Sequence, residues 1–150
     1  MDLTITEASL ADAHEIAEIE ASSFTDPWSE KSIEESLASS AVTTYKAVSD
    51  GMICGYASLM SVSGEGELIN IAVRSYCRKN GIGQALMDKV AETAMERGIK
   101  SLYLEVRSMN IPARAMYEKN GFGIIGVRRT YYRNPSDDAI IMKKTIEEKQ

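Results

Sequence analysis

The sequence predicts a mixed α/β fold of about seven strands and about four helices, formed by a single domain over residues 1–150. Stretches of strand length alternate with stretches of helical periodicity, which is typical of a sheet with helices packed against it. Two pairs of strand-like stretches are separated only by short turns, so part of the sheet is expected to consist of hairpins. The composition, 44% hydrophobic and 26% charged, is that of an ordinary globular domain.

The first expected element is a short strand at residues 4–6, and two helices follow it. Ser9 can cap the first helix through Asp12, and that helix is expected to run to Ala21. The second helix is expected to start at Ser29. The apolar positions that should face the core on these helices are Ala13, Ile16, Ala17, Ile19, Ile33 and Leu37.

A hairpin is expected next, because Asp50-Gly51 is a strong two-residue turn between the strand-like residues 43–49 and 52–62. A fourth strand, residues 67–73, precedes a turn that contains two glycines. The later elements are a helix over 84–97 ended by Gly98, a strand over 101–106, a helix opened by Asn110 and Pro112 and ended by Gly121, and a hairpin of strands 122–132 and 139–145.

The turn between the fourth strand and the third helix has the composition of an anion-binding site. Its glycines let the backbone approach a ligand closely, and the start of the helix adds a partial positive charge. A pyrophosphate is the expected ligand, although a solvent-facing basic turn would have a similar sequence. The spacing is not that of nucleotide-hydrolase phosphate loops or of dinucleotide-binding turns. The residues of this turn are Arg78, Lys79, Asn80, Gly81, Ile82 and Gly83.

The composition argues against several other classes of function. Two cysteines, Cys54 and Cys77, and one histidine, His14, are too few for a zinc site, and no metal is expected. The net charge of −5 argues against direct nucleic-acid binding, and no apolar run reaches membrane-spanning length. The first residues show no basic region followed by an apolar one, so a cytoplasmic protein is expected. The acidity also suits a basic protein substrate, although mild acidity is common.

The glycine turn matches R-x-x-G-x-G, which resembles the acyl-coenzyme-A signature of the GNAT N-acetyltransferases. Further segments resemble the ribosomal-protein-alanine N-acetyltransferases, the RimI family within GNAT. The resemblance covers nearly the whole chain and implies the GNAT fold, a mostly antiparallel sheet with a splayed central parallel pair. The segments that carry it are residues 24–31, 70–73, 104–110, 115–122, 128–132 and 138–142.

Acetyl transfer to an amine requires a base that takes a proton from the ammonium and an acid that protonates the departing thiolate. The resemblance implies Glu105 as the base and Tyr117 as the acid. From the residues alone, Glu105 can equally well pair with Arg107, and Tyr117 can be an ordinary core residue. Glu67 is a rival base, but its place at a strand start beside Glu65 and two glycines predicts a solvated edge residue.

The resemblance also implies acetyl-coenzyme A as the acetyl donor. The backbone of residues 71–73 would pair with the pantetheine arm, residues 79–84 would hold the pyrophosphate, and Asn110 would contact the donor through its side chain. The family's loop is often rich in arginine, whereas this chain has one arginine there, which leaves a backbone cradle intact. The implied positions are Ile71, Ala72, Val73, Arg78, Lys79, Asn80, Gly81, Ile82, Gly83, Gln84 and Asn110.

The acceptor that the resemblance implies is a protein N-terminus, the N-terminal alanine of small-subunit ribosomal protein eighteen. Trp28, Tyr131 and Tyr132 can line the acceptor site, and ordinary packing of loop against hairpin is the competing interpretation. Asp137 and Asp138 can attract a basic peptide or can be turn residues. The alternative functions are acetylation of small amines, lysines or other N-termini, a non-catalytic coenzyme-A-binding regulator, and a module that binds basic ribosomal tails.

Overall fold

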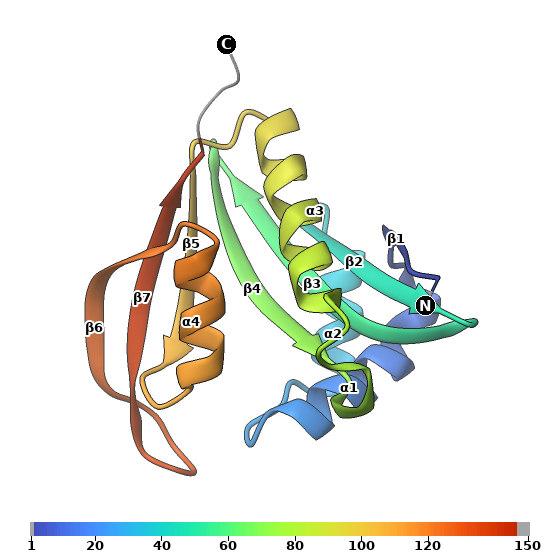
Figure 1. Ribbon diagram of the computed structural model, residues 1–150, viewed down its shortest axis with the longest axis horizontal. Coiled ribbons are helices and arrows are strands. Elements are labelled where there is room, and N and C mark those ends of the chain that lie inside the picture. The colour runs from blue at the N-terminus through green and yellow to red at the C-terminus, as the bar shows by residue number, and fades with distance from the viewer. Residues whose placement is uncertain (1, 147–150) are drawn as a thin grey trace. The chain divides into compact units, whose positions relative to one another are not determined.

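A computed structural model describes residues 2–146 and contains seven strands in the hydrogen-bonded order β1-β2-β3-β4-β5-β7-β6. Figure 1 shows these strands together with the four α-helices. The strands are β1 (Thr4–Glu7), β2 (Val42–Ser49), β3 (Met52–Val62), β4 (Glu65–Val73), β5 (Ser101–Arg107), β6 (Gly123–Tyr132) and β7 (Asp137–Thr145). The helices are α1 (Ala13–Ser23), α2 (Glu30–Ala38), α3 (Ile82–Glu96) and α4 (Ile111–Lys119), and two short 3₁₀ turns are η1 (Leu10–Asp12) and η2 (Ser75–Cys77).

The sheet confirms the predicted fold class. β1–β2, β2–β3, β5–β7 and β6–β7 pair antiparallel, whereas β4 and β5 pair in parallel. The parallel register runs from Glu65 opposite Ser101 to Glu67 opposite Tyr103, which is a short part of the nine-residue β4. A short parallel pairing is what a splayed central pair requires.

The chain packs as two compact units, which we describe separately. The first unit contains residues 2–60 and 68–93, and the second contains residues 61–67 and 94–146. In the first unit, α1 and α2 lie on one side of the strands and α3 lies on the other (Figure 1). The apolar cluster of this unit is formed by residues of α1, α2, β3 and β4, and consists of Ala13, Ile16, Ile19, Ile33, Ile53, Tyr56 and Ala72. Four of the six predicted stripe positions, 13, 16, 19 and 33, are therefore in the core, and Ala17 and Leu37 are partly buried against it.

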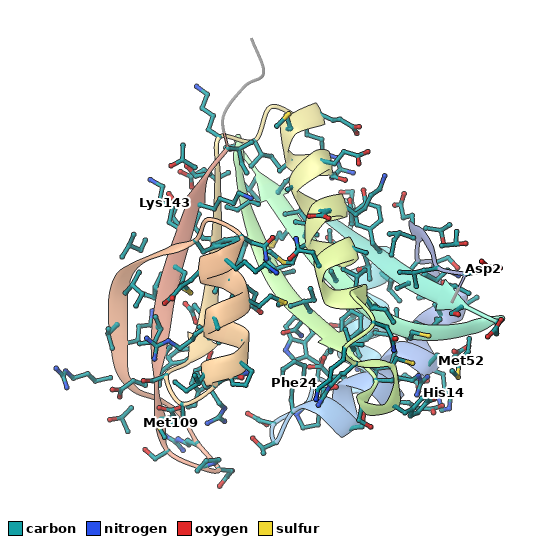
Figure 2. The ribbon with its side chains drawn as sticks, viewed as in Figure 1. Asp2, His14, Phe24, Met52, Met109 and Lys143 are labelled. Atoms are coloured by element: carbon teal, nitrogen blue, oxygen red, sulfur yellow. The ribbon has the colours of Figure 1, made fainter. Side chains whose placement is uncertain are left out.

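The second unit is built on the β5–β7 pair. Alternate residues of β5 are buried, and Leu104 lies opposite Met142 while Val106 lies opposite Ile140. Side chains of a strand point alternately to its two faces. The unburied residues of β5, including Glu105, therefore lie on the other face of this pair. Figure 2 shows the side chains of both units on the ribbon.

Two local contacts explain where the first helices begin. Asp12 accepts a hydrogen bond from the Ser9 N–H at 2.8 Å, but this pair opens the turn η1, and α1 starts only at Ala13. Ser9 was predicted to cap the first helix, but it caps the 3₁₀ turn η1, and the α-helix follows one turn later. Ser29 caps α2 as predicted, because its Oγ accepts from the Ser32 N–H at 3.1 Å.

Gly55 marks a close approach between β3 and β4. A Cβ at this position would lie 2.8 Å from the carbonyl oxygen of Ala72, so only glycine fits without movement of the backbone. None of the helices within residues 2–146 is long and apolar enough to cross a membrane.

Candidate active site

The second unit places Glu105 on the strand face that the core leaves uncovered. The Glu105 side chain is 27% exposed, and its Oε1 lies 3.6 Å from Nε of Arg128 on β6. The alternative that Glu105 pairs with Arg107 is wrong. Arg107 instead donates hydrogen bonds to the carbonyl oxygens of Arg133 and Pro135, at 2.9 and 2.8 Å. The β6–β7 connection thus supplies the hydrogen-bond partners of Arg107.

Glu67 shares the electrostatic environment of Glu105. Burial raises the pKa of the Glu67 carboxyl, the charge of Glu105 raises it further, and Arg128 opposes both effects. The prediction of a solvated edge residue is therefore wrong. The reason is topological, since β4 is paired through Glu67 with Tyr103 of β5 and is not an edge of the sheet.

Tyr117 lies on α4 with only 8% of its surface exposed. Its ring packs edge-on against Phe122, with 5.9 Å between the centroids. Burial, and then the proximity of Tyr132, raises the pKa of the Tyr117 hydroxyl to about 12. The core interpretation is therefore confirmed as far as packing goes, and the same burial keeps the hydroxyl protonated at neutral pH, as a proton donor must be.

The two tyrosines at the end of β6 pack against each other and against arginines. The rings of Tyr131 and Tyr132 meet edge-on at 5.1 Å, Arg107 lies 4.5 Å from the Tyr132 centroid, and Arg128 lies 5.5 Å from that of Tyr131. Burial, and then the charge of Glu105, raises the pKa of Tyr132. Packing of the hairpin thus accounts for much of their position, while Tyr131 remains 50% exposed.

Asp137 and Asp138 begin β7 and fasten neighbouring backbone. Asp137 accepts from the N–H of Met109 at 3.0 Å, and Asp138 accepts from the N–H of Thr130 at 2.7 Å. Met109 itself is exposed at the end of the β5–α4 connection (Figure 2). The turn interpretation describes these two carboxylates better than that of a free acidic patch. Asn110 caps α4 as predicted, accepting from the Ala113 N–H at 3.3 Å.

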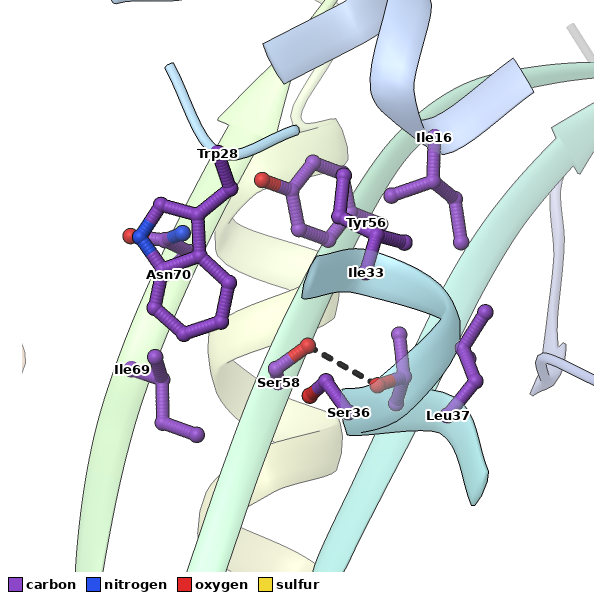
Figure 3. Close-up of a pocket in the computed structure, with 10 residues that line it drawn as sticks. Ile16, Trp28, Ile33, Ser36, Leu37, Tyr56, Ser58, Ile69 and Asn70 are labelled. Atoms are coloured by element: carbon purple, nitrogen blue, oxygen red, sulfur yellow. Dashed lines mark hydrogen bonds between the residues drawn. The ribbon is translucent and has the colours of Figure 1, made fainter. Parts of the chain in front are cut away.

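A small pocket in the first unit adjoins Trp28 (Figure 3). It lies among α1, α2 and strands β2 to β4. Trp28, which is 41% exposed, forms part of its wall. Its lining residues are Ile16, Trp28, Ile33, Ser36, Leu37, Thr44, Tyr56, Ser58, Ile69 and Asn70. Trp28 thus borders a concave surface in its own unit, next to the β4 residue Asn70, which precedes the predicted pantetheine strand.

Glu20 is a buried polar residue of this region that was not predicted from the sequence. It is 2% exposed, and its carboxylate accepts hydrogen bonds from the Tyr56 hydroxyl, the Asn70 amide and the Trp28 N–H. Burial raises the pKa of Glu20, and the bonds from Tyr56 and Trp28 oppose that rise. The available signal was helical spacing, because Glu20 follows Ile16 by four residues and so lies on the apolar face of α1.

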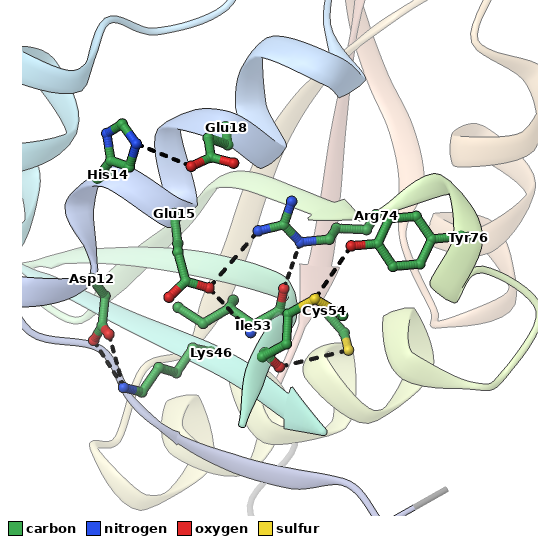
Figure 4. Close-up of polar contacts among 10 residues, drawn as sticks. Asp12, His14, Glu15, Glu18, Lys46, Ile53, Cys54, Arg74 and Tyr76 are labelled. Atoms are coloured by element: carbon green, nitrogen blue, oxygen red, sulfur yellow. Dashed lines mark hydrogen bonds and ion pairs between the residues drawn. The ribbon is translucent and has the colours of Figure 1, made fainter. Parts of the chain in front are cut away.

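Polar contacts hold the end of β4, where the predicted pantetheine strand meets the glycine turn (Figure 4). Arg74 donates from Nε to the carbonyl oxygen of Ile53 at 2.7 Å, and its N–H donates to the carbonyl oxygen of Cys54 at 2.7 Å. Glu15 accepts from the Ile53 N–H at 3.3 Å and lies 3.8 Å from the Arg74 guanidinium. These contacts fasten the end of β4 to β3 and α1.

Two residues of the glycine turn have left-handed backbone conformations. Gly81 has φ of +75° and Lys79 has φ of +66°, a left-handed region that favours glycine at position 81. Asn80 donates to the carbonyl oxygens of Cys77 and Arg78, and Arg78 donates from Nε to that of Val73 at 3.2 Å.

The third helix starts earlier than predicted. α3 begins at Ile82 and not at Gln84, so Ile82 and Gly83 form its first turn. The Ile82 side chain is 1% exposed, which leaves only its backbone for a ligand. The first N–H groups of an α-helix lack partners within the helix and point along its axis, so this turn can accept an anion.

The sequence is similar to those of known acetyltransferases. A profile described as the acetyltransferase (GNAT) family matches residues 13–122. A [ribosomal protein bS18]-alanine N-acetyltransferase from Escherichia coli K12 is 33% identical over 145 residues, covering 95% of this chain and 97% of that protein. An N-alpha-acetyltransferase RimI from Mycobacterium tuberculosis is 35% identical over 148 residues, covering 95% and 92%.

Solved structures show the same fold. The crystal structure of the ribosomal-protein-S18-alanine N-acetyltransferase from Escherichia coli matches with a TM-score of 0.93 and 31% identity, covering 99% of this chain and 97% of that one. The structure of Ard1 from Thermoplasma volcanium matches with a TM-score of 0.90 and 28% identity, covering 99% and 100%.

Proposed function

The chain belongs to the GNAT acetyltransferase family, as an acetyl-coenzyme-A-dependent N-acetyltransferase of the RimI group, and we propose that it acetylates the N-terminal alanine of ribosomal protein bS18. The observation that supports this acceptor is the identity of 31–36% over more than nine-tenths of the chain with bacterial enzymes that carry this activity in their names. We accordingly place the reaction in the cytoplasm.

An α-amine is also a chemically suitable acceptor. An α-amino group titrates about two to three pH units below a lysine side chain, so a carboxylate base has far less to do at neutral pH. We assign that base to Glu105. Its partner Arg128 is 56% exposed and lies 3.6 Å away, so the incoming ammonium can replace it beside the carboxylate.

The donor supplies the thioester whose carbonyl carbon the neutral amine attacks, and the carbon–sulfur bond breaks as the amide forms. Glu105 takes the first proton from the ammonium, and Tyr117, protonated in its buried position, donates its proton to the departing sulfur. The second proton, which the nitrogen loses as the amide forms, returns to the Tyr117 oxygen and restores the hydroxyl. No covalent enzyme intermediate is required. Glu67 in the role of Glu105 is the rival base within this scheme, and the variants Glu105→Gln and Glu67→Gln distinguish the two.

The donor-binding residues in the proposal are backbone groups. The strand backbone at Ile71–Val73 would pair with the pantetheine arm, and the cradle at Gly81 and the start of α3 would hold the pyrophosphate. We propose that Arg78 and Lys79 add charge, and that Trp28, Tyr131 and Tyr132 border the acceptor.

The test is mass spectrometry of two peptides after incubation with acetyl-coenzyme A. One peptide begins with a free alanine followed by basic and aromatic residues, and the other has a blocked N-terminus and an internal lysine. Acetylation confined to the alanine α-amine is expected. Modification of the lysine alone, or of neither peptide, would contradict the proposed acceptor, and a sample without the protein controls for uncatalysed transfer.

A further inference from the structure

Glu20 is the only charged residue within residues 2–146 that is fully buried, at 2% exposure. It lies on α1 beside Ile16 and Ile19, which are 1% and 0% exposed. A carboxylate in such surroundings is costly unless hydrogen bonds replace its water. Ile16 and Ile19 are apolar and offer the carboxylate no hydrogen bond. Any role of the carboxylate must therefore come from its hydrogen-bond partners elsewhere in the unit.

The partners of Glu20 come from three different segments of the first unit. The Tyr56 hydroxyl belongs to β3, the Asn70 amide belongs to β4 at 3.3 and 3.4 Å from the two carboxylate oxygens, and the Trp28 N–H belongs to the α1–α2 connection at 3.2 Å. Figure 3 shows the three partner side chains around one pocket. One carboxylate therefore joins the connection that carries Trp28 to the strand that leads into Ile71.

We propose that Glu20 is a positioning residue of the acceptor site, which holds the main chain at Trp28 against β3 and β4. The inference rests on the proposed function for the statement that Trp28 borders the acceptor. Trp28 is 41% exposed, so its own packing secures it only in part, and its N–H donates to the Glu20 carboxylate at 3.2 Å.

A purely stabilising role explains Glu20 poorly. Replacement of a buried charged group by a well-packed apolar one is often neutral or stabilising, so burial of a carboxylate is weak evidence of a contribution to stability. What the carboxylate does supply is several acceptor sites at one point, and all three partners are donors there. Glutamine has the same size but only one oxygen, and its amide would face donors. Glu20→Gln should therefore release part of the network without creating a cavity.

The first measurement uses the fact that Trp28 is the only tryptophan of the chain. Its fluorescence therefore reports this segment alone. In Glu20→Gln we expect stronger quenching by acrylamide and emission at longer wavelength. Glu18→Gln is the matched control on the same helix, because Glu18 is 53% exposed and contacts His14, and it should leave both signals unchanged.

The second measurement is kinetic. Loss of a hydrogen bond to a charged group is expected to raise KM for the alanine peptide about tenfold in Glu20→Gln. KM for acetyl-coenzyme A and Tm should stay near those of wild type. In a Trp28→Ala background, Glu20→Gln should add little to the rise in KM, because both changes then act through the same side chain.

Unchanged quenching in Glu20→Gln overturns the inference whether or not the alanine peptide is a substrate, so its failure is distinguishable from failure of the proposed function. Increased quenching with an unchanged acceptor KM, or full additivity with Trp28→Ala, also overturns it. Should Glu20→Gln not fold, Glu20→Asp retains the charge but withdraws it by one methylene, and it must increase the quenching as well.

Discussion

Each unit contains a carboxylate that matters to this protein, and their surroundings differ sharply. Glu20 in the first unit is 2% exposed and accepts from three uncharged donors on three segments. Glu105 in the second unit has a side chain that is 27% exposed, and its charged partner Arg128 is itself 56% exposed. A carboxylate saturated by fixed donors holds backbone in place, whereas one with an exposed, replaceable partner can exchange that partner for a substrate.

The comparison also separates Glu105 from Glu67, which share the second unit. Arg128 contributes to both, but only Glu105 has it within ion-pair distance. The backbone of Glu67 pairs with Tyr103 of β5. Burial, and then the charge of Glu105, raises the pKa of the Glu67 carboxyl. Glu105 is the proposed base because its exposed cationic partner can be exchanged for the substrate ammonium. The raised pKa of Glu67 also suits a general base, so Glu67 is the rival that the next variants distinguish from it.

The largest effect is expected when the exchangeable carboxylate is removed. Glu105→Gln should lower kcat for the alanine peptide by about a hundredfold or more, because general base catalysis contributes on that scale. Glu67→Gln is the matched control and should lose less than about tenfold. Steady-state kinetics with the alanine peptide measures both. If Glu67→Gln shows the larger loss, the two roles are reversed and the comparison fails.

A smaller loss is expected for the proposed acid. Tyr117→Phe should lower kcat by about ten- to a hundredfold, since water can replace part of its proton donation. The ring contact with Phe122 at 5.9 Å is retained, so thermal unfolding should show little loss of stability. Binding of acetyl-coenzyme A, measured by calorimetry, should be unaffected. A drop in Tm with unchanged kcat would leave Tyr117 as a core residue only.

The sequence predicted most of the secondary structure because the local signals are strong. The Asp50-Gly51 turn has φ of +51° and +74°, as a two-residue hairpin requires, and Ser29 and Asn110 cap the helices that follow them. Boundaries were predicted less well where two signals compete. Ser9 opens a 3₁₀ turn and not α1 itself, and α3 begins two residues before Gln84.

The site was predicted less completely than the fold, because partners across a sheet are not encoded in local spacing. Glu105 and Arg107 are close in sequence, yet Arg107 turns to backbone carbonyls beyond residue 130, and Arg128 comes to Glu105 from β6. Similarly, Glu67 is partly buried and not at a sheet edge, because β5 pairs beside it. Glu20 was detectable as an acid on an apolar helix face, but its three donors depend on the tertiary fold.

The coupling between the two carboxylates of the second unit can be measured directly. The charge of Glu105 raises the pKa of Glu67 and Arg128 lowers it. In Glu105→Gln the pKa of Glu67 should therefore fall, and in Arg128→Ala it should rise. Carbon-13 NMR of the labelled side-chain carboxyl follows this titration. Shifts of the same sign in both variants would contradict the shared environment inferred from the structure.

The smallest expected effect is the change with pH in the stability contributed by the buried carboxyl of Glu20. Burial raises the pKa of Glu20 in the folded chain, so the folded state holds its proton to higher pH than the unfolded state does. The associated stability is complete below the pKa of the unfolded chain and is lost as pH rises through that of the folded chain. Glu20→Gln has no such dependence, so its free energy of unfolding relative to wild type should increase from acidic to neutral pH.

Urea unfolding at several pH values measures this difference, with Glu18→Gln as the exposed control. A difference that stays constant with pH would mean that Glu20 is ionised as easily in the folded chain as in the unfolded one, and the contrast with the open Glu105 would then be one of hydrogen bonding alone.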